Sequence, residues 1–181
     1  MNWPYRHGLS FILLLSLGIW GCNRYEPEYQ QLEKHLASGN WRQADQLTKQ
    51  LFYKVGPRRS GGFLSPNGYL SRVKFESFPC KDLNRIEQMW ATHSQGRFGF
   101  TVQKRLYVET GNTIDGTFDY KSYRTFRERV GWMKDGKILL YHQLSFEDSS
   151  PVGHLPAMNT NEAGIREPLF MRLEVCRAIV D

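Results

Sequence analysis

FPCKDLNRIEQMWATHSQGRFGFTVQ, residues 78–103, is the densest combination of aromatic residues and turn signals in the chain. Asp82 can cap a helix, because its carboxylate can accept hydrogen bonds from free N–H groups of the first turn. The apolar residues that follow have the spacing of one helical face: Leu83, Ile86, Met89 and Trp90. Gly96 predicts the helix end, since glycine readily turns left-handed. With Phe98 and Phe100 directly after it, the stretch predicts the centre of a packed helical core.

Two further helices are predicted before this stretch. One starts at Pro27, which suits the first turn of a helix, and ends before Gly39. The other starts after Asn40, which with Gln43 has the pattern of a capping box. Their apolar residues again recur at helical spacing: Tyr29, Leu32 and Leu36, then Trp41, Ala44, Leu47 and Leu51. The two helices are expected to pack as an antiparallel hairpin.

The remaining chain is also predicted to be mainly helical. A short helix is expected at residues 69–75, another at 120–130, and a last one from Pro168 onward. Residues 101–108 are ambiguous, because apolar residues alternate as in a strand at the start of this segment and then recur at the spacing of a helix. Residues 137–141 are expected to be a short strand or an extended segment. The predicted fold class is all-α: a compact, single-domain helical bundle.

Two long loops, at residues 55–68 and 144–165, are rich in glycine, proline and serine. In the second loop, LSFEDSSPVGHLP (144–156) places apolar side chains around a proline and a glycine. Such side chains can pin the loop to the core, or they can form a wall for a flat apolar ligand. The pattern alone leaves both alternatives open.

The N-terminus has the pattern of an export signal. Arg6 gives it a positive start, and residues 9–20 are almost wholly apolar but too short to span a bilayer comfortably. Gly21 and Cys22 at its end resemble a bacterial lipobox, after which Cys22 would carry lipid; a short uncleaved signal anchor is the alternative. Both place the domain outside the cytoplasm and at a membrane, on the periplasmic or thylakoid-lumen side. The chain is thus predicted to have three parts: a signal at 1–22, a tether at 23–28 and a helical domain at 29–181.

If Cys22 is lipidated, two cysteines remain. An even pair in an oxidising compartment is a candidate disulfide, here Cys80 with Cys176. Such a bond would tie the central stretch to the last helix. Two buried free thiols are the alternative, because sequence does not give the geometry.

The sequence disfavours enzymes and nucleic-acid binders. The net charge of +6 is compatible with anionic partners, but acids lie among the basic residues and no basic arm or zinc-finger pattern appears. No P-loop, Rossmann or HExxH motif is present. The histidines are scattered and predict no metal site. Cys80 and His93 lack a third orienting group, so a structural role for Cys80 is favoured over a nucleophile.

Five segments occur in order at plausible intervals: SGNWRQAD, FPCKDLNRIEQMW, GRFGFTVQ, VGW and SPVGHLP. Together they resemble the Genomes-Uncoupled-Four family, the tetrapyrrole-binding regulators of magnesium chelatase in chlorophyll biosynthesis. The resemblance covers about residues 29–176. It implies an all-α core and therefore favours a helix over a strand at 101–108.

The resemblance also implies a cupped apolar surface that binds protoporphyrin and its magnesium form. Two loops would line it, at 57–69 and 144–158 here. Apolar side chains would stack on the macrocycle and arginines would meet its carboxylates, which gives the expected porphyrin-binding set: Phe63, Leu64, Leu144, Phe146, Leu155, Pro156, Arg58, Arg59 and Arg97. Phe146 stands where members involved in chlorophyll synthesis tend to have tryptophan. No tightly bound cofactor or metal is expected, and His154 is expected to support its loop rather than to ligate a metal.

The export signal limits the partners. The family's chelatase works on the cytoplasmic or stromal side, so its large subunit is a possible partner only if the chain is not exported. The sequence therefore predicts a membrane-tethered, non-catalytic tetrapyrrole sensor or carrier. The alternative is a protein-interaction module that keeps the fold and has lost porphyrin binding.

Overall fold

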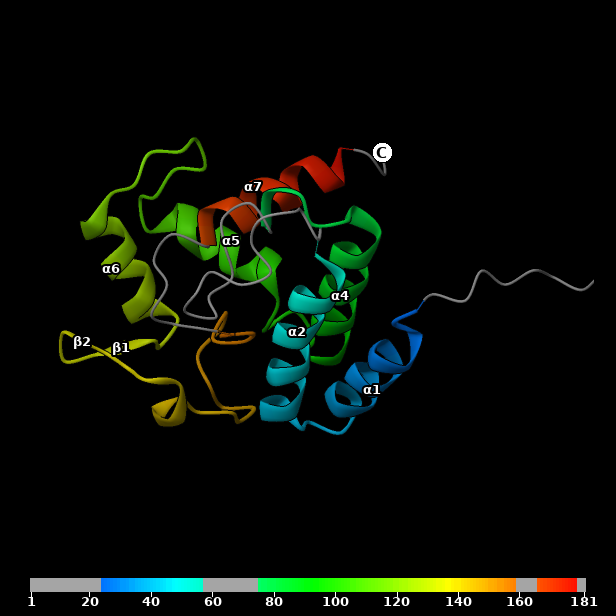
Figure 1. Ribbon diagram of the computed structural model, residues 1–181. Helices are drawn as coiled ribbons and strands as arrows, with labels where there is room; N and C mark the ends of the chain where they lie inside the picture. The colour runs from blue at the N-terminus through cyan, green and yellow to red at the C-terminus, as the bar shows by residue number, and fades with distance from the viewer. Residues whose placement is uncertain (1–23, 57–74, 159–165, 179–181) are drawn as a thin grey trace, which may run out of the picture.

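The computed structural model describes residues 24–56, 75–158 and 166–178, and these form a mainly helical domain, which confirms the predicted all-α class (Figure 1). The helices are α1 (Glu26–Ala37), α2 (Trp41–Val55), α4 (Cys80–His93), α5 (Phe100–Glu109), α6 (Tyr120–Arg129) and α7 (Arg166–Arg177). Within the described residues the only sheet is the antiparallel pair β1 (Met133–Lys134) and β2 (Lys137–Ile138). A 3-10 turn, η1 (Tyr141–Gln143), follows it.

The predicted hairpin of α1 and α2 is present, and α1 also packs on α4 (Figure 1). Each helix buries the apolar face that its sequence predicts. Gly39 between them has a φ of +66°, a conformation that glycine adopts without the steric cost of a Cβ. The predicted capping box is wrong, since the side chain of Asn40 makes no capping hydrogen bond.

The central stretch forms α4 and the start of α5. The four predicted apolar residues of α4 are buried, and Gly96 follows the helix with a φ of +75°. The prediction that Asp82 caps α4 is wrong: its carboxylate instead accepts a 2.5 Å hydrogen bond from Tyr29 Oη on α1. Residues 101–108 lie within α5, as the family resemblance implies.

The N-terminus of α5 is capped by a side chain of α4. The Glu87 carboxylate accepts hydrogen bonds from the backbone N–H groups of Phe100, at 2.6 Å, and of Thr101, at 2.9 Å. A carboxylate at a helix N-terminus also interacts favourably with the helix dipole. Gly99 allows this contact, because a Cβ at that position would lie 3.0 Å from Glu87 Oε1.

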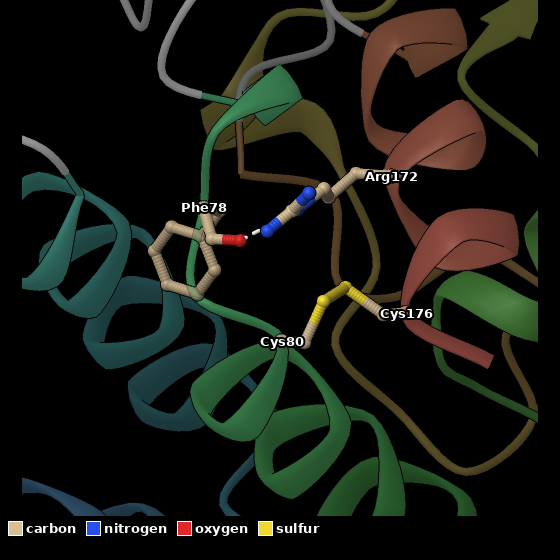
Figure 2. Close-up of a disulfide and its surroundings, with 4 residues drawn as sticks. All are labelled: Phe78, Cys80, Arg172 and Cys176. Carbon is tan, nitrogen blue, oxygen red and sulfur yellow. Dashed lines mark hydrogen bonds between the residues drawn. A yellow bond between two sulfur atoms is a disulfide. The ribbon is translucent and has the colours of Figure 1, made fainter. Parts of the chain in front are cut away.

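A disulfide between Cys80 and Cys176 joins the start of α4 to the end of α7 (Figure 2). This confirms the predicted disulfide and rules out the alternative of two free thiols. Beside it, Arg172 Nε donates a 2.7 Å hydrogen bond to the Phe78 carbonyl. Helix α7 begins at Arg166, two residues before the predicted start. The disulfide and the hydrogen bond together fix α7 against α4.

Helix α6 agrees with its prediction and is capped by Asp119, which accepts hydrogen bonds from two backbone N–H groups. The predicted extended segment at 137–141 starts with the short strand β2. Of the helix expected at 69–75, only Phe75 is described, and it is helical and buried. No helix among the described residues is long and apolar enough to cross a bilayer.

Candidate functional site

The loop at residues 144–158 is bound directly to the central GRFGF segment. The Gly153 N–H donates to the Arg97 carbonyl at 2.8 Å, and the Gly99 N–H donates to the Leu155 carbonyl at 2.9 Å. Gly153 has no room for a side chain, because a Cβ there would lie 2.7 Å from Leu106 Cδ1 on α5. The two glycine-containing motifs therefore mark the places where loop and core approach most closely.

The VGW segment after α6 holds the same loop from another side. Trp132 Nε1 donates to the His154 carbonyl at 2.8 Å. His154 Nδ1 lies 2.6 Å from the Val130 carbonyl, so this nitrogen carries a proton and donates. Burial is the main cause that lowers the pKa of His154, which favours the neutral ring. This placement agrees with the interpretation that His154 supports the loop.

Asp45 on α2 is completely buried and binds the end of the loop. Its Oδ1 accepts hydrogen bonds from the N–H groups of Ala157, at 2.5 Å, and Met158, at 3.1 Å. Its Oδ2 accepts a 2.8 Å hydrogen bond from Tyr141 Oη. Burial raises the pKa of Asp45, while these donors and the positive charge of Arg166 act in the opposite direction.

Arg166, the first residue of α7, binds the opposite side of the same backbone. It is 1% exposed, and its guanidinium donates to the carbonyls of Pro156 and Ala157. Gln103 on α5 accepts a 3.0 Å hydrogen bond from Arg166 and donates to the Gly153 and Pro156 carbonyls, each at 3.0 Å. The guanidinium also lies 4.3 Å from the centre of the Trp132 ring, a cation–π contact.

Sequence reasoning missed Asp45, although a signal was present. Asp45 lies four residues after Trp41 and three before Thr48, all of which are buried on α2. A carboxylate on the apolar face of a helix is expensive to bury and so indicates partners elsewhere in the chain. Gln103 stands at a similar buried position of α5. Arg166 is also buried, and its hydrogen bonds to Gln103, Pro156 and Ala157 define its role in holding the loop.

A hollow of about 460 Å³ lies between α2 and the segment that Asp45 binds. The residues that line it are Gln46, Lys49, Gln50 and Tyr53 of α2, with Tyr141 and Met158 across from them. Its size is within the range of small-molecule sites in proteins. The rings of Tyr53 and Tyr141 offer apolar surface, and the Lys49 amine offers a positive charge.

The predicted site residues fall into three groups. Phe146 is half-buried, with its ring 5.3 Å from that of Tyr141 and the Arg42 guanidinium 4.1 Å above it, so it lies near the hollow. Leu144, Leu155 and Pro156 are buried in the protein interior. The other predicted residues lie outside the described chain: Phe63, Leu64, Arg58 and Arg59, together with the proposed lipidation site Cys22.

Arg97 is not brought together with Phe146 at the hollow. It is exposed, its Nη2 donates to the Ser150 carbonyl at 2.8 Å, and it lines a separate hollow of about 260 Å³ beside Trp41 and Asp148. Arg42 and Lys49, which were not predicted, are the cations near the larger hollow. Among residues 24–56, 75–158 and 166–178, no three metal-ligating side chains gather.

A helical frame, a loop bound through its main chain and a partly apolar hollow beside that loop define a small α-helical domain with a candidate ligand site. A family profile described as GUN4-like matches residues 23–170. The chain therefore belongs to the GUN4-like family, as its five sequence segments predict.

Individual relatives agree with this assignment. The chloroplastic tetrapyrrole-binding protein of Arabidopsis thaliana is 30% identical over 141 residues, which cover 72% of this chain and 48% of the relative. A Ycf53-like protein of Synechocystis is 31% identical over 134 residues, covering 73% and 52%. The chain thus spans about half the length of these curated relatives.

Solved structures show the same fold. Ligand-free GUN4 of Arabidopsis thaliana superposes with a TM-score of 0.61 at 28% identity, over 79% of this chain and 91% of that one. GUN4 of Chlamydomonas reinhardtii gives a TM-score of 0.61 at 22% identity, over 78% and 85%. The second comparison supports the fold alone.

Proposed function

We propose that this protein is a non-catalytic tetrapyrrole-binding sensor or carrier, with porphyrin or magnesium-porphyrin as a reversible ligand. The observation that carries the proposal is the hollow between α2 and the loop bound by Asp45. It lies in a chain of the GUN4-like family that is 30% identical to a protein named tetrapyrrole-binding. The fold accounts for the hollow, because α2 forms one wall and also anchors the other.

The chemistry of the hollow suits a flat, apolar ring with carboxylates at its edge. Tyr53 and Tyr141 can contact the faces of a macrocycle. Lys49, which lines the hollow, can pair with a carboxylate. Phe146 adds an aromatic ring, with Arg42 stacked on it. No described residue is required as a metal ligand, so the free and the magnesium forms are both candidates.

The test is a titration of the full chain in detergent with protoporphyrin and, separately, with its magnesium form. Saturable quenching of tryptophan fluorescence and a shifted Soret band are expected at micromolar ligand. Phe146→Ala should weaken binding by about tenfold, the value of one aromatic contact. No saturable change with either ligand would overturn the proposal.

The matched control is Phe118→Ala. Phe118 is also a partly exposed phenylalanine, but it lies on the loop before α6, where its ring contacts Tyr123 and not the hollow residue Tyr141 that Phe146 contacts. This variant should bind porphyrin as the unsubstituted chain does. If both substitutions reduce affinity equally, the 144–158 loop is not part of the site.

We further propose that the domain is exported and tethered to a membrane through lipid on Cys22. This rests on the sequence of residues 1–22, with its positive start, apolar segment and terminal Gly21–Cys22. Metabolic labelling with a radioactive fatty acid should label the protein, and Cys22→Ser should abolish the label. Unlabelled protein that stays with membranes would favour the uncleaved anchor instead.

A second function is favoured by one contact. The face of Phe146 is already covered by Arg42 at 4.1 Å, which would reduce stacking on a ligand and suits a protein-interaction module that no longer binds porphyrin. Magnesium chelatase large subunit is the partner to test if the chain is not exported. Porphyrin-independent capture of that purified subunit, with no Soret change, would support this function over the first.

A further inference from the structure

We propose that Asp45 is the positioning residue of the ligand site, fixing the far walls of the hollow at a set distance from α2. The proposal rests on the proposed function of the hollow as a tetrapyrrole site. Asp45 does not line the hollow and would not touch the ligand. It acts through Tyr141 and Met158, which line the hollow.

One carboxylate binds both far walls. Oδ2 accepts the hydroxyl hydrogen of Tyr141 on η1, and Oδ1 accepts the N–H groups at the end of the loop. The near wall consists of the residues one, four, five and eight positions after Asp45 on the same helix: Gln46, Lys49, Gln50 and Tyr53. A single side chain therefore ties both far walls to the helix that forms the near wall.

Met158 shows how tightly this end of the loop is determined. It is a non-glycine residue with a φ of +50°, a conformation that is unfavourable unless the surroundings enforce it. The hydrogen bond from its N–H to Asp45 and the burial of its side chain both do so. Arg166 holds the preceding carbonyl groups from the opposite side.

An ionised carboxylate suits this position better than a neutral amide. Three donors converge on Asp45, and a carboxylate can accept all of them with its two oxygens. An asparagine would present an NH₂ group to one of these donor sets. Burial raises the pKa of Asp45, and the three donors and the positive charge of the buried Arg166 counter that effect.

The test compares two tyrosines that make the same contact in different places. Tyr141→Phe removes the hydrogen bond to Asp45, and Tyr29→Phe removes the hydrogen bond from Tyr29 to Asp82 between α1 and α4. Tyr141→Phe should weaken protoporphyrin binding by about tenfold. Tyr29→Phe should leave the affinity within about twofold, although it removes a comparable hydrogen bond.

A double-mutant cycle separates the action of Asp45 from direct contact by the Tyr141 hydroxyl. If Asp45 acts through Tyr141, the fold loss of porphyrin affinity in the double variant Asp45→Asn/Tyr141→Phe should be smaller than the product of the fold losses in the two single variants. Strictly multiplicative losses would overturn the proposal. Because Asp45→Asn could lower stability, each titration should be made well below the unfolding midpoint of that variant.

Amide hydrogen exchange gives a readout that ordinary destabilisation would not produce. The Ala157 and Met158 amides should exchange faster in Tyr141→Phe and Asp45→Asn, but not in Tyr29→Phe. Suppose that the unsubstituted chain binds porphyrin, but Tyr141→Phe has the same porphyrin affinity and the same amide exchange rates as Tyr29→Phe. The positioning role of Asp45 would then be wrong. If the unsubstituted chain binds no porphyrin, the proposed function fails, and this role fails with it.

Discussion

Single atoms decide the packing at Gly99. Gly99 has a φ of +118°, and a Cβ added at this position would lie 3.0 Å from Glu87 Oε1. Only a hydrogen atom fits there. The same carboxylate caps α5, so a side chain at Gly99 would disturb both the backbone and the cap. The second glycine of GRFGF is therefore required both by its backbone conformation and by its contact with Glu87.

Gly99→Ala should lower the free energy of unfolding by about 1–3 kcal/mol, from backbone strain and displacement of Glu87. Chemical denaturation followed by circular dichroism measures this loss. Gly96→Ala is the control. Gly96 has a φ of +75°, but a Cβ added there would have no atom within 4 Å, so this variant loses stability only through backbone strain. Equal losses in the two variants would show that the Glu87 contact contributes little.

His154 should make stability depend on pH. In the folded state, burial lowers the pKa of His154 below its ordinary value of 6.5, which applies to the unfolded chain. At a pH between the folded-state pKa and 6.5, the unfolded chain therefore binds a proton that the folded chain does not. The contribution of His154 to stability is fully present above about pH 6.5 and is lost as the pH falls toward the folded-state pKa. Urea unfolding at pH 7.5, 6.5 and 5.5 should show this decline.

The matched comparison uses His142, which is exposed on η1. His154→Asn keeps a donor for the Val130 carbonyl, and it should flatten the decline below pH 6.5 even if it lowers stability overall. His142→Asn should leave the decline unchanged. If stability still declines below pH 6.5 in His154→Asn, other titratable groups cause the decline.

At this scale the sequence predicts side chains that act locally and misses those that act at a distance. The apolar residues of α4 follow from spacing alone. Asp45 and Arg166 do not: Asp45 binds backbone 112 and 113 residues away, and Arg166 binds the Gln103 side chain, 63 residues before it. Arg97 was assigned to the ligand by motif position, whereas its guanidinium binds the Ser150 carbonyl.

Among the elements, α7 is the one whose position depends most on cross-links. It is joined to α4 by the disulfide, and to Phe78, just before α4, by a hydrogen bond from Arg172 (Figure 2). Its first residue, Arg166, binds the loop. A change at the disulfide end of α7 can therefore reach the ligand site through a single helix.

Replacing both cysteines, Cys80→Ser/Cys176→Ser, should lower the free energy of unfolding by up to about 4–5 kcal/mol, because the bond closes a loop with a sequence separation of 96. Denaturant unfolding with and without dithiothreitol measures the loss. Reductant should destabilise the unsubstituted chain to the same extent and have no effect on the double variant. A reductant effect that persists in the double variant would assign it to something other than this bond.

The positions of most helices were predictable, but the first residues of α1, α4 and α7 were not. Periodic apolar residues specify a helix over several turns, whereas the boundary depends on one or two contacts. The expected Asn40 cap does not form, and Asp82 is recruited by Tyr29 from another helix. Residues 101–108 needed the family resemblance, since the local pattern fits helix and strand equally.

Across the whole molecule, a ligand that binds only the folded state must stabilise it. At a protoporphyrin concentration of 100 times Kd, the expected gain is about 2.7 kcal/mol. Thermal unfolding at increasing ligand should show a midpoint that rises with concentration. In Phe146→Ala the same rise should need about ten times more ligand, and a midpoint independent of ligand would count against binding to the folded chain.

The all-α class and the importance of the 144–158 loop follow from the sequence and its family resemblance. The depth of burial within that loop does not. Leu144 and Leu155 were expected to face the ligand, and the structure places them in the hydrophobic core. An apolar loop residue serves either purpose, and only the three-dimensional contacts distinguish them. The other expected ligand loop, at 57–69, lies outside the described residues.

The loop that borders the hollow is fastened through its main chain. Asp45, Gln103 and Arg166 bind its N–H and C=O groups, which every amino acid other than proline provides in the same form. Side chains along the outer edge of the loop can therefore be exchanged without loosening its attachment. The domain is accordingly a suitable framework for engineering: one anchored backbone could display different side chains and so accept different flat ligands.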